Sequence, residues 1–436
     1  MEHLNGLTRR RFIQSAAALA ATAAIGDRLP AQPAARVSRV VRAHNVAATA
    51  DFAPQADVVE AMMRASIRRL TGLQDEVTGL GKLMGPVGPE QRIVIKINSM
   101  GGPPAIGTSA EAVRGLVVIL RQLLAGQGAV EMEQITVWDN APVAYLEPAL
   151  DGLCRIHSTY LREQWDVDPH TRVVLPHPPS SPGLPVQRVL TQADHLISFG
   201  ALKAHPLAGT CGVMKNYFGA VPLAVELHSH APMARSEVFG PWNLPADLSM
   251  AVRLDGRESF NATLKAGTYS GDQIVGQLKP QLGPCEVIKM AYMGDLLLLA
   301  APGECREMAV SGPLAGTLGV PEGTYFATDV NQTIAELYGH EMLGGKTRLC
   351  VIDGLRGIYD EGPYHEPHEF QSYPERTPNT LLLSTDPVAI DAAATQIVAA
   401  ERALHEGLRD GFDIGYLKAA EATGLGQAEG YEVVEA

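Results

Sequence analysis

The chain has 436 residues, of which 46% are hydrophobic and 19% are charged, a balance typical of a folded globular protein and not of a disordered one. Its formal net charge of −13 and its pI near 5.5 argue against nucleic acid as a general partner, because binding to phosphates needs a basic surface. A local basic site for a small anion stays compatible with these values. The length allows two or three domains.

The N-terminus has the order of residues that is typical of an export signal. A twin-arginine motif is matched by Thr8-Arg9-Arg10-Arg11-Phe12-Ile13-Gln14, and a weakly apolar, alanine-rich run follows at 16–25. That run is too short to cross a membrane, since a transmembrane helix needs about 20 apolar residues. We therefore expect residues 1–35 to be a signal peptide, with the twin-arginine export machinery as a partner and a periplasmic or otherwise extracytoplasmic location. We expect no stable transmembrane span elsewhere.

An alternation of strands and helices begins in the first third of the chain. The apolar run at 92–98 predicts a short buried strand. Thr108 and Glu111 form a capping box before a predicted helix at 110–124, and the next strand is predicted at 135–140. A strand, a helix and a second strand of these lengths form a βαβ unit, so the sheet should be largely parallel.

The same pattern returns later in the chain. Buried strands are predicted at 194–198, 348–354 and 380–384. The last of them is followed by Asp386, a natural N-cap, and by a predicted helix at 388–399. These elements predict an α/β fold in which a largely parallel, twisted sheet has helices on both faces.

The pattern is interrupted in the middle of the chain. Residues 240–330 do not continue the strand and helix alternation, and we interpret them as an inserted α+β subdomain. The predicted organisation is therefore a signal peptide, a first part of the α/β domain at 36–239, this insertion, and a second part of the α/β domain at 331–436.

The most informative stretch, residues 199–221, follows the predicted strand at 194–198. It places two lysines and a histidine beside glycines, on a path that we expect to be a loop leading into a short helical segment. Lysine is rarely fully buried without a partner, so the stretch indicates a site for an anionic or carbonyl-bearing ligand. A loop whose charges point into solvent is the alternative.

Polar residues also follow the other predicted strands. In an open parallel sheet, ligands bind outside the carboxyl ends of the strands, so residues that are distant in sequence should meet at one edge. This argument gives the candidate catalytic residues Lys203, His205, Lys215 and Asp353, and the candidate ligand-binding residues Lys96, Asn98, Asn216, Asp386 and Asp391. Asp386 has the alternative role of a helix cap, and Asp353 that of a turn residue.

These residue types allow two kinds of chemistry. Lys203, His205 and Lys215 could clamp a carboxylate or phosphate, or polarise a carbonyl while a base removes a proton. A desolvated lysine can also lose its own proton and act as a nucleophile or base. Carboxylates among the candidates could supply the base or hold a metal.

Histidines form a second pattern. His228 and His230 lie two residues apart, and His365 and His368 flank a Glu-Pro pair. A divalent metal bound by His228, His230 and His365 is an open alternative, and ordinary surface histidines are the other. Pro367 excludes a regular helix between His365 and His368. The five cysteines contain no Cys-x-x-Cys pair, so the chain has no iron–sulfur cluster motif.

The pattern Lys-x-His-Pro-x-x-Gly-x-x-Gly-x-Met-Lys-Asn-x-Phe-Gly at 203–219 resembles the central signature of the bacterial and archaeal proteins grouped as domain of unknown function 362. Further stretches that are similar to the family lie at 93–98, 346–355, 362–363 and 384–391. The twin-arginine motif is typical of an exported branch. The resemblance implies an α/β fold class and a shared set of motif positions, but it does not imply a particular reaction.

Two functions are compatible with these observations. We expect an enzyme that acts on a small anionic substrate at the C-terminal edge of the sheet, with or without a metal. The alternative is a periplasmic ligand- or cofactor-binding protein that uses the same groups without turnover. Replacing a general acid or base separates them, because a catalyst then loses turnover while it keeps its ligand.

Overall fold

The computed structural model describes most of the chain after residue 36. The described residues are 37–99, 106–128, 132–159, 166–173, 184–205, 208–221, 242–244, 248–254, 258–269, 273, 289–293, 296–300, 305–310, 323–326, 330–360, 362, 366–408 and 412–436. The predicted signal peptide lies outside them. In the described part, no helix is both long and apolar enough to cross a membrane.

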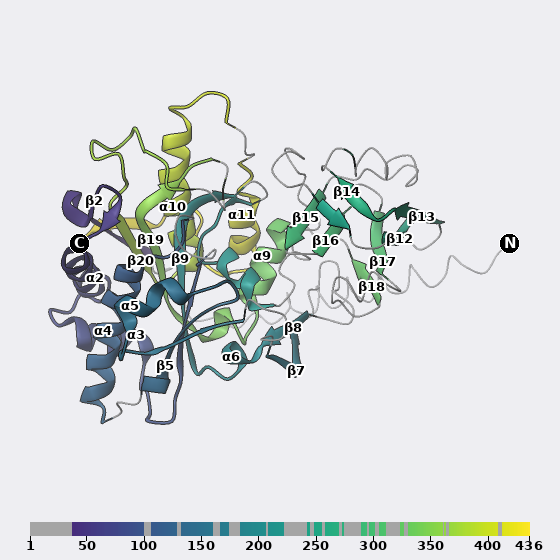
Figure 1. The fold of residues 1–436 in the computed structure, drawn as a ribbon. Coiled ribbons are helices and arrows are strands. Elements are labelled where there is room, and N and C mark those ends of the chain that lie inside the picture. The colour runs from purple at the N-terminus through teal and green to yellow at the C-terminus, as the bar shows by residue number, and fades with distance from the viewer. Residues whose placement is uncertain are drawn as a thin grey trace, which may run out of the picture. The chain divides into compact units, whose positions relative to one another are not determined.

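One large sheet organises these residues (Figure 1). Its strands lie in the order β21-β1-β20-β19-β9-β4-β5-β6, and the short β10 pairs with β9. Their bounds are β1 Arg39–His44, β4 Ile93–Ile97, β5 Ile135–Asp139, β6 Arg155–Ser158, β9 His195–His205, β10 Gly209–Thr210, β19 Thr347–Ile358, β20 Thr380–Ser384 and β21 Glu432–Glu435.

Most neighbouring strands of this sheet are parallel. The pairs β19·β9, β9·β4, β4·β5 and β5·β6 are parallel, as is β1·β21. β20 is antiparallel to both of its neighbours, β1 and β19. The predicted α/β fold with a largely parallel sheet is therefore confirmed, although β20 runs in the opposite direction.

Helices cover both faces of the sheet, and residue alternation along the strands explains why. In β4, the side chains of Ile93, Ile95 and Ile97 belong to one hydrophobic cluster and that of Val94 to the other, because successive side chains of a strand point to opposite faces. The first cluster includes residues of α2 Ala56–Thr71, α3 Glu76–Met84, α4 Ala110–Gly126 and α5 Glu147–Leu150. The second includes residues of α6 Arg188–Thr191, α9 Val330–Gly339, α10 Pro387–Arg402 and α11 Gly415–Ala422.

The strands between residues 242 and 326 form small sheets of their own. β12, β13, β17 and β18 make a four-stranded sheet, and β11 pairs with β14 and β15 with β16. Their bounds are β11 Trp242–Leu244, β12 Leu248–Leu254, β13 Glu258–Leu264, β14 Gly267–Tyr269, β15 Lys289–Met293, β16 Leu296–Ala300, β17 Cys305–Val310 and β18 Gly323–Phe326. Two further strand pairs are β2 Thr49–Ala50 with β3 Ala53–Pro54, and β7 Val167–Val173 with β8 Leu184–Gln187.

Candidate functional site

Polar side chains meet at one edge of the large sheet, where the parallel strands β4, β5 and β9 end. Lys96 lies in β4 and Asn98 directly follows that strand. Asp139 ends β5, while Lys203 and His205 end β9. Asn98 is half-buried and the other four side chains are buried. Groups that are more than 100 residues apart in sequence are thereby brought together.

The expected loop at Lys203 and His205 is instead the end of a strand. β9 extends to His205 because Lys203 pairs with Ile358 of β19. The chain then turns back as β10, where Gly209 pairs with His205. Strand pairing on both sides explains why this segment is ordered and buried, and the loop prediction was wrong for it.

Lys96 forms a buried ion pair with Asp139. Its ammonium group lies 3.0 Å from the Asp139 carboxylate, 3.1 Å from the Asn216 side-chain oxygen and 2.6 Å from the backbone oxygen of Ile97. Burial lowers the pKa of Lys96, and the carboxylate of Asp139 partly offsets that effect. The second carboxylate oxygen of Asp139 accepts the backbone N–H of Ser99 at 2.6 Å. This lysine is therefore fully satisfied by its own protein.

Lys203 is buried against neutral oxygens. Its amino group donates to the side-chain oxygen of Asn98 at 2.5 Å and to the backbone oxygen of Ile106 at 3.2 Å. Burial lowers the pKa of Lys203 to about 8. Cys211 and Asp139 nearby oppose that effect, and the ammonium groups of Lys215 and Lys96 add to it. A fraction of this amine is therefore unprotonated near pH 8.

Lys215 lies in the short 3₁₀ segment η5 Lys215–Ala220 and is only 8% exposed. Its ammonium nitrogen is 4.8 Å from the ring centroid of Phe218, which is a cation–π distance. Burial lowers the pKa of Lys215, Cys211 nearby opposes that effect, and Lys96 adds to it. Among the described residues, the ion pair with Asp139 belongs to Lys96, and no carboxylate pairs with Lys203 or Lys215.

Lys96, Lys203 and Lys215 form what we call the lysine cluster. Asn216, which follows Lys215 in η5, holds that segment against Lys96: its side-chain N–H donates to the backbone oxygen of Lys96 at 2.8 Å, and its oxygen accepts from the Lys96 ammonium. Gly219 permits this close packing, since a β-carbon there would lie 3.1 Å from the ammonium nitrogen of Lys96. With one carboxylate among its described partners, the cluster carries an excess of positive charge when its lysines are protonated.

Asp391 holds the segment that carries Lys215. It is fully buried in α10 and accepts the backbone N–H groups of Val213 at 2.7 Å and Met214 at 3.2 Å. Burial raises the pKa of Asp391 to about 7, against the effect of these hydrogen bonds. A β-carbon on Gly212 would overlap the Asp391 carboxylate, so only glycine fits there. The structure thus gives Asp391 a supporting position behind the cluster.

Asp353 also makes contacts that order the backbone. One carboxylate oxygen accepts the backbone N–H and the hydroxyl of Ser109 at 2.7 and 2.6 Å, and the other accepts the N–H of Leu355 at 2.9 Å. Ser109 is the N-cap of α4, so Asp353 anchors the start of that helix. The predicted capping box of Thr108 and Glu111 is wrong, because Thr108 donates instead to the backbone oxygen of Phe199 at 3.0 Å.

Asp386 lies at the opposite edge of the sheet from the lysine cluster. Asp386 follows β20, which runs antiparallel to β19, so the end of β20 does not lie at the edge where the parallel strands end. The prediction that Asp386 lies at that edge was therefore wrong. Its carboxylate caps α10 by accepting the N–H groups of Val388 and Ala389 at 2.8 and 2.9 Å. The other oxygen accepts the hydroxyl of Ser38 and the N–H of Gln427. The alternative role as a helix cap is the one that these contacts support.

The predicted metal ligands cannot be placed. His228, His230 and His365 lie outside the described residues. Within the part of the chain that is described, no group of three or more histidine, cysteine, aspartate and glutamate side chains is arranged to hold a metal ion.

Asp139 was expected to end a strand at this edge but was not among the candidate catalytic or ligand-binding residues. Its ion pair with Lys96 is what makes it a member of the site. Ser198 was also missed, although its hydroxyl accepts from Asn216 at 3.3 Å and donates to the backbone oxygen of Val213 at 2.8 Å. A lysine inside a strand that is otherwise apolar was the available signal for a buried acidic partner.

Fold and site together define an α/β protein with a buried cluster of lysines at the C-terminal edge of its parallel strands. The family described as Domain of unknown function (DUF362) matches residues 93–396, and these include every member of the lysine cluster. Because this match covers more than half of the chain, the protein belongs to that family. A comparison with curated proteins found no match.

Proposed function

We propose that the protein is an enzyme that acts on a small anionic substrate at the lysine cluster. The observation that carries this proposal is the burial of Lys203 and Lys215 without a carboxylate partner among the described residues. An isolated ammonium group is costly to bury, so such groups are expected to have a functional reason for their position. A bound carboxylate or phosphate would supply the missing negative charge.

The two lysines differ in what they would contribute. Lys215, held over the Phe218 ring, would act as a fixed positive charge for the anionic group. Lys203 has a pKa lowered to about 8, so its amine could accept a proton from the substrate or add to a carbonyl carbon. His205 ends the same strand and would face the same ligand. A divalent metal held by His228, His230 and His365 remains part of the proposal for a metal-assisted reaction.

We also propose that the protein reaches the periplasm through twin-arginine export. The motif at residues 8–14 and the alanine-rich run after it support this location. Replacement of Arg9 and Arg10 by lysine should leave the protein in the cytoplasm, as measured by cell fractionation. Periplasmic protein at the wild-type level would contradict the proposal.

The proposed function is tested first on protein purified after native export. Native mass spectrometry with elemental analysis identifies any anion or metal that travels with the protein. A substrate screen around that ligand then compares the wild type with Lys203→Ala and His205→Ala. An enzyme should lose turnover in these variants while retaining ligand in at least one of them. If both variants keep every activity that the screen detects, the catalytic proposal fails, and ligand binding without any turnover would favour the binding-protein alternative.

A further inference from the structure

Cys211 differs from the other cysteines whose side chains the structure describes. Cys154, Cys211 and Cys350 are all free and buried. Cys154 and Cys350 each belong to one of the two hydrophobic clusters, and burial raises the pKa of both thiols to about 12. Cys211 belongs to neither cluster, and no described residue forms a hydrogen bond with its sulfur, whereas the Tyr338 hydroxyl lies 3.3 Å from that of Cys350. Core packing therefore does not explain this cysteine.

Strand pairing places Cys211 directly beside Lys203. β10 pairs with the end of β9 in antiparallel register, with Thr210 opposite Ala204. Cys211 continues this register, because its backbone N–H donates to the backbone oxygen of Lys203 at 2.8 Å. Residues that are directly opposed in antiparallel strands have their β-carbons about 5 Å apart, on the same face. The thiol and the amine of this pair therefore start from neighbouring positions.

The charge of Cys211 acts on two lysines of the cluster. Cys211 is the largest influence that opposes the effect of burial on the pKa of Lys203, and the same holds for Lys215. A negative charge on the sulfur is thus attracted to both ammonium groups. Because the attraction is mutual, the two ammonium groups stabilise a thiolate, which is the nucleophilic form of cysteine. One thiolate against two ammonium groups leaves one positive charge for an anionic ligand.

The ammonium group of Lys215 is an independent indication of a ligand at this place. Its side chain is only 8% exposed, yet no described residue accepts a hydrogen bond from it. An ammonium group has three N–H donors, and the ring of Phe218 beneath it offers no acceptor oxygen. A ligand that brings its own oxygens would satisfy these donors.

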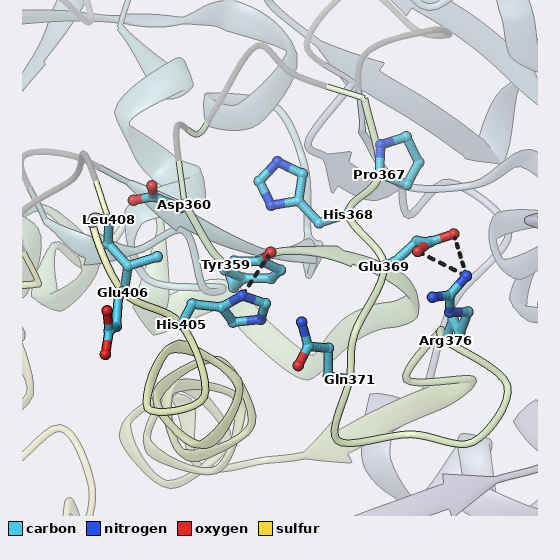
Figure 2. Close-up of a pocket in the computed structure, with 11 residues that line it drawn as sticks. Tyr359, Asp360, Pro367, His368, Glu369, Gln371, Arg376, His405, Glu406 and Leu408 are labelled. Carbon is cyan, nitrogen blue, oxygen red and sulfur yellow. Dashed lines mark hydrogen bonds and ion pairs between the residues drawn. The ribbon is translucent and has the colours of Figure 1, made fainter.

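The pocket beside the end of β19 shows the opposite situation (Figure 2). Arg376 pairs there with Glu369 at 3.0 Å. Nδ1 of His405 lies 3.4 Å from the Tyr359 hydroxyl, and its Nε2 lies 2.7 Å from the Glu401 carboxylate. These groups are used by the protein itself, so their positions need no ligand. The thiol and the Lys215 ammonium at the lysine cluster have no such explanation.

We propose that Cys211 is the nucleophile of the lysine cluster and that the substrate is a small anion that carries an aldehyde or ketone group. This inference rests on the proposed function of the cluster as an anion site. The sulfur forms a bond to the carbonyl carbon, and the π electrons of the carbonyl move to its oxygen. Lys203, which takes the proton of the thiol, returns it to that oxygen. The product is a hemithioacetal or hemithioketal, and no further reactant is needed. Lys215 holds the anionic group.

Alkylation of the folded, full-length protein tests the nucleophile. Iodoacetate and iodoacetamide both alkylate thiols and differ in charge, and peptide mass mapping measures the adduct at each cysteine. Cys211 should react at least about tenfold faster with iodoacetate, because a positively charged site concentrates anions. Lys215→Met should remove most of this preference.

Cys154 is the matched control within the same molecule. Its exposed fraction is 5%, as is that of Cys211. Cys154 should react slowly with both reagents, because burial raises the pKa of its thiol to about 12. A difference between the two cysteines therefore reports the lysines and not the exposure. This comparison uses the wild type and does not depend on the folding of any variant.

Addition to a carbonyl group is followed with carbon-13 glyoxylate, a two-carbon carboxylate that carries an aldehyde. NMR of the wild type should show a protein-bound carbon signal distinct from those of free glyoxylate and its hydrate. Cys211→Ser should lose this signal while glyoxylate still raises its melting temperature. Acetaldehyde, which lacks the carboxylate, should form the adduct at about one-tenth of the level, the size of a hydrogen bond to a charged group. Cyanoborohydride distinguishes a lysine nucleophile, because it reduces an imine to a stable amine and leaves a hemithioacetal unreduced.

Three results would overturn the inference. The first is alkylation of Cys211 no faster than that of Cys154. The second is equal rates of Cys211 with iodoacetate and iodoacetamide. The third is glyoxylate trapped by cyanoborohydride on Lys203, since the lysine would then be the nucleophile. In each case, glyoxylate or phosphate that raises the melting temperature of the wild type leaves the anion site in place. If neither binds, the proposed function itself is contradicted.

Discussion

Lys96 and Lys215 carry the same charge in the same cluster, yet their contacts predict opposite effects on stability. Lys96→Met leaves the buried Asp139 carboxylate without its cation. Breaking a buried ion pair in this way costs about 3 kcal/mol or more of unfolding free energy. Chemical denaturation at pH 7 measures this loss. A Lys96→Met, Asp139→Asn double variant should recover part of it, and an unchanged unfolding free energy in Lys96→Met would show that the ion pair is not formed.

Lys215→Met should be neutral or stabilising in the absence of ligand. The variant loses the cation–π contact with Phe218 but removes a buried ammonium group that has no carboxylate partner among the described residues. We expect the unfolding free energy to rise by about 1 kcal/mol or to stay the same, as is common where function conflicts with stability. The measurement is differential scanning calorimetry in a buffer without phosphate, sulfate or carboxylate anions. A loss as large as that of Lys96→Met would mean that Lys215 has a structural partner.

At the level of elements, the segment before η5 is fixed by a contact between Gly212 and α10. Gly212→Ala places a β-carbon on the Asp391 carboxylate, so the segment or the helix must move. We expect a loss of about 3 kcal/mol, in the range of severe backbone and packing conflicts. Gly126→Ala is the control, because a β-carbon there meets nothing within 4 Å, and it should be neutral or slightly stabilising. Equal stability of the two variants would contradict the tight packing.

The elements themselves were largely predictable from the sequence. The strand at 380–384 has the predicted bounds, and the helix predicted at 110–124 is α4, because both have strong apolar patterns. The antiparallel orientation of β20 was not predictable, because an apolar run does not indicate whether a strand is parallel or antiparallel to its neighbours. Misassigning it placed Asp386 at the wrong edge of the sheet.

Much of the site also depends on contacts that no local pattern contains. The burial of Lys203 beside Asn98 comes from the side-by-side packing of β4 and β9. Asp391 contacts Val213 across 178 residues of sequence, so its supporting position could be seen only in three dimensions. The motif indicated which residues belong to the site region. Only the tertiary structure separates those that form the lysine cluster from those that support its backbone.

At the level of the whole molecule, Asp391 links stability to pH. Its pKa is about 7 in the folded protein and about 4 in an unfolded chain. Between about pH 4 and pH 7 the folded state therefore keeps a proton that the unfolded state has released. This contribution therefore stabilises the fold most at low pH and is lost as the pH rises from about 4 to 7. Relative to Asp391→Asn, the wild type should lose stability across that window by up to about 1.4 kcal/mol per pH unit. The unfolding free energy of both proteins is measured by chemical denaturation at each pH. If it changes with pH in the same way in both, the assignment of a buried, protonated carboxyl at Asp391 is contradicted.

The central claim is that the lysine cluster is an anion site, and a binding titration tests it most directly. Phosphate, sulfate, small dicarboxylates and 2-oxo acids are titrated into the wild type and Lys215→Met, with calorimetry and thermal stabilisation as readouts. We predict that at least one of these anions binds the wild type and raises its melting temperature, and that Lys215→Met loses this binding while keeping its fold. Failure of every anion to bind the wild type, or equal binding by Lys215→Met, would contradict the assignment.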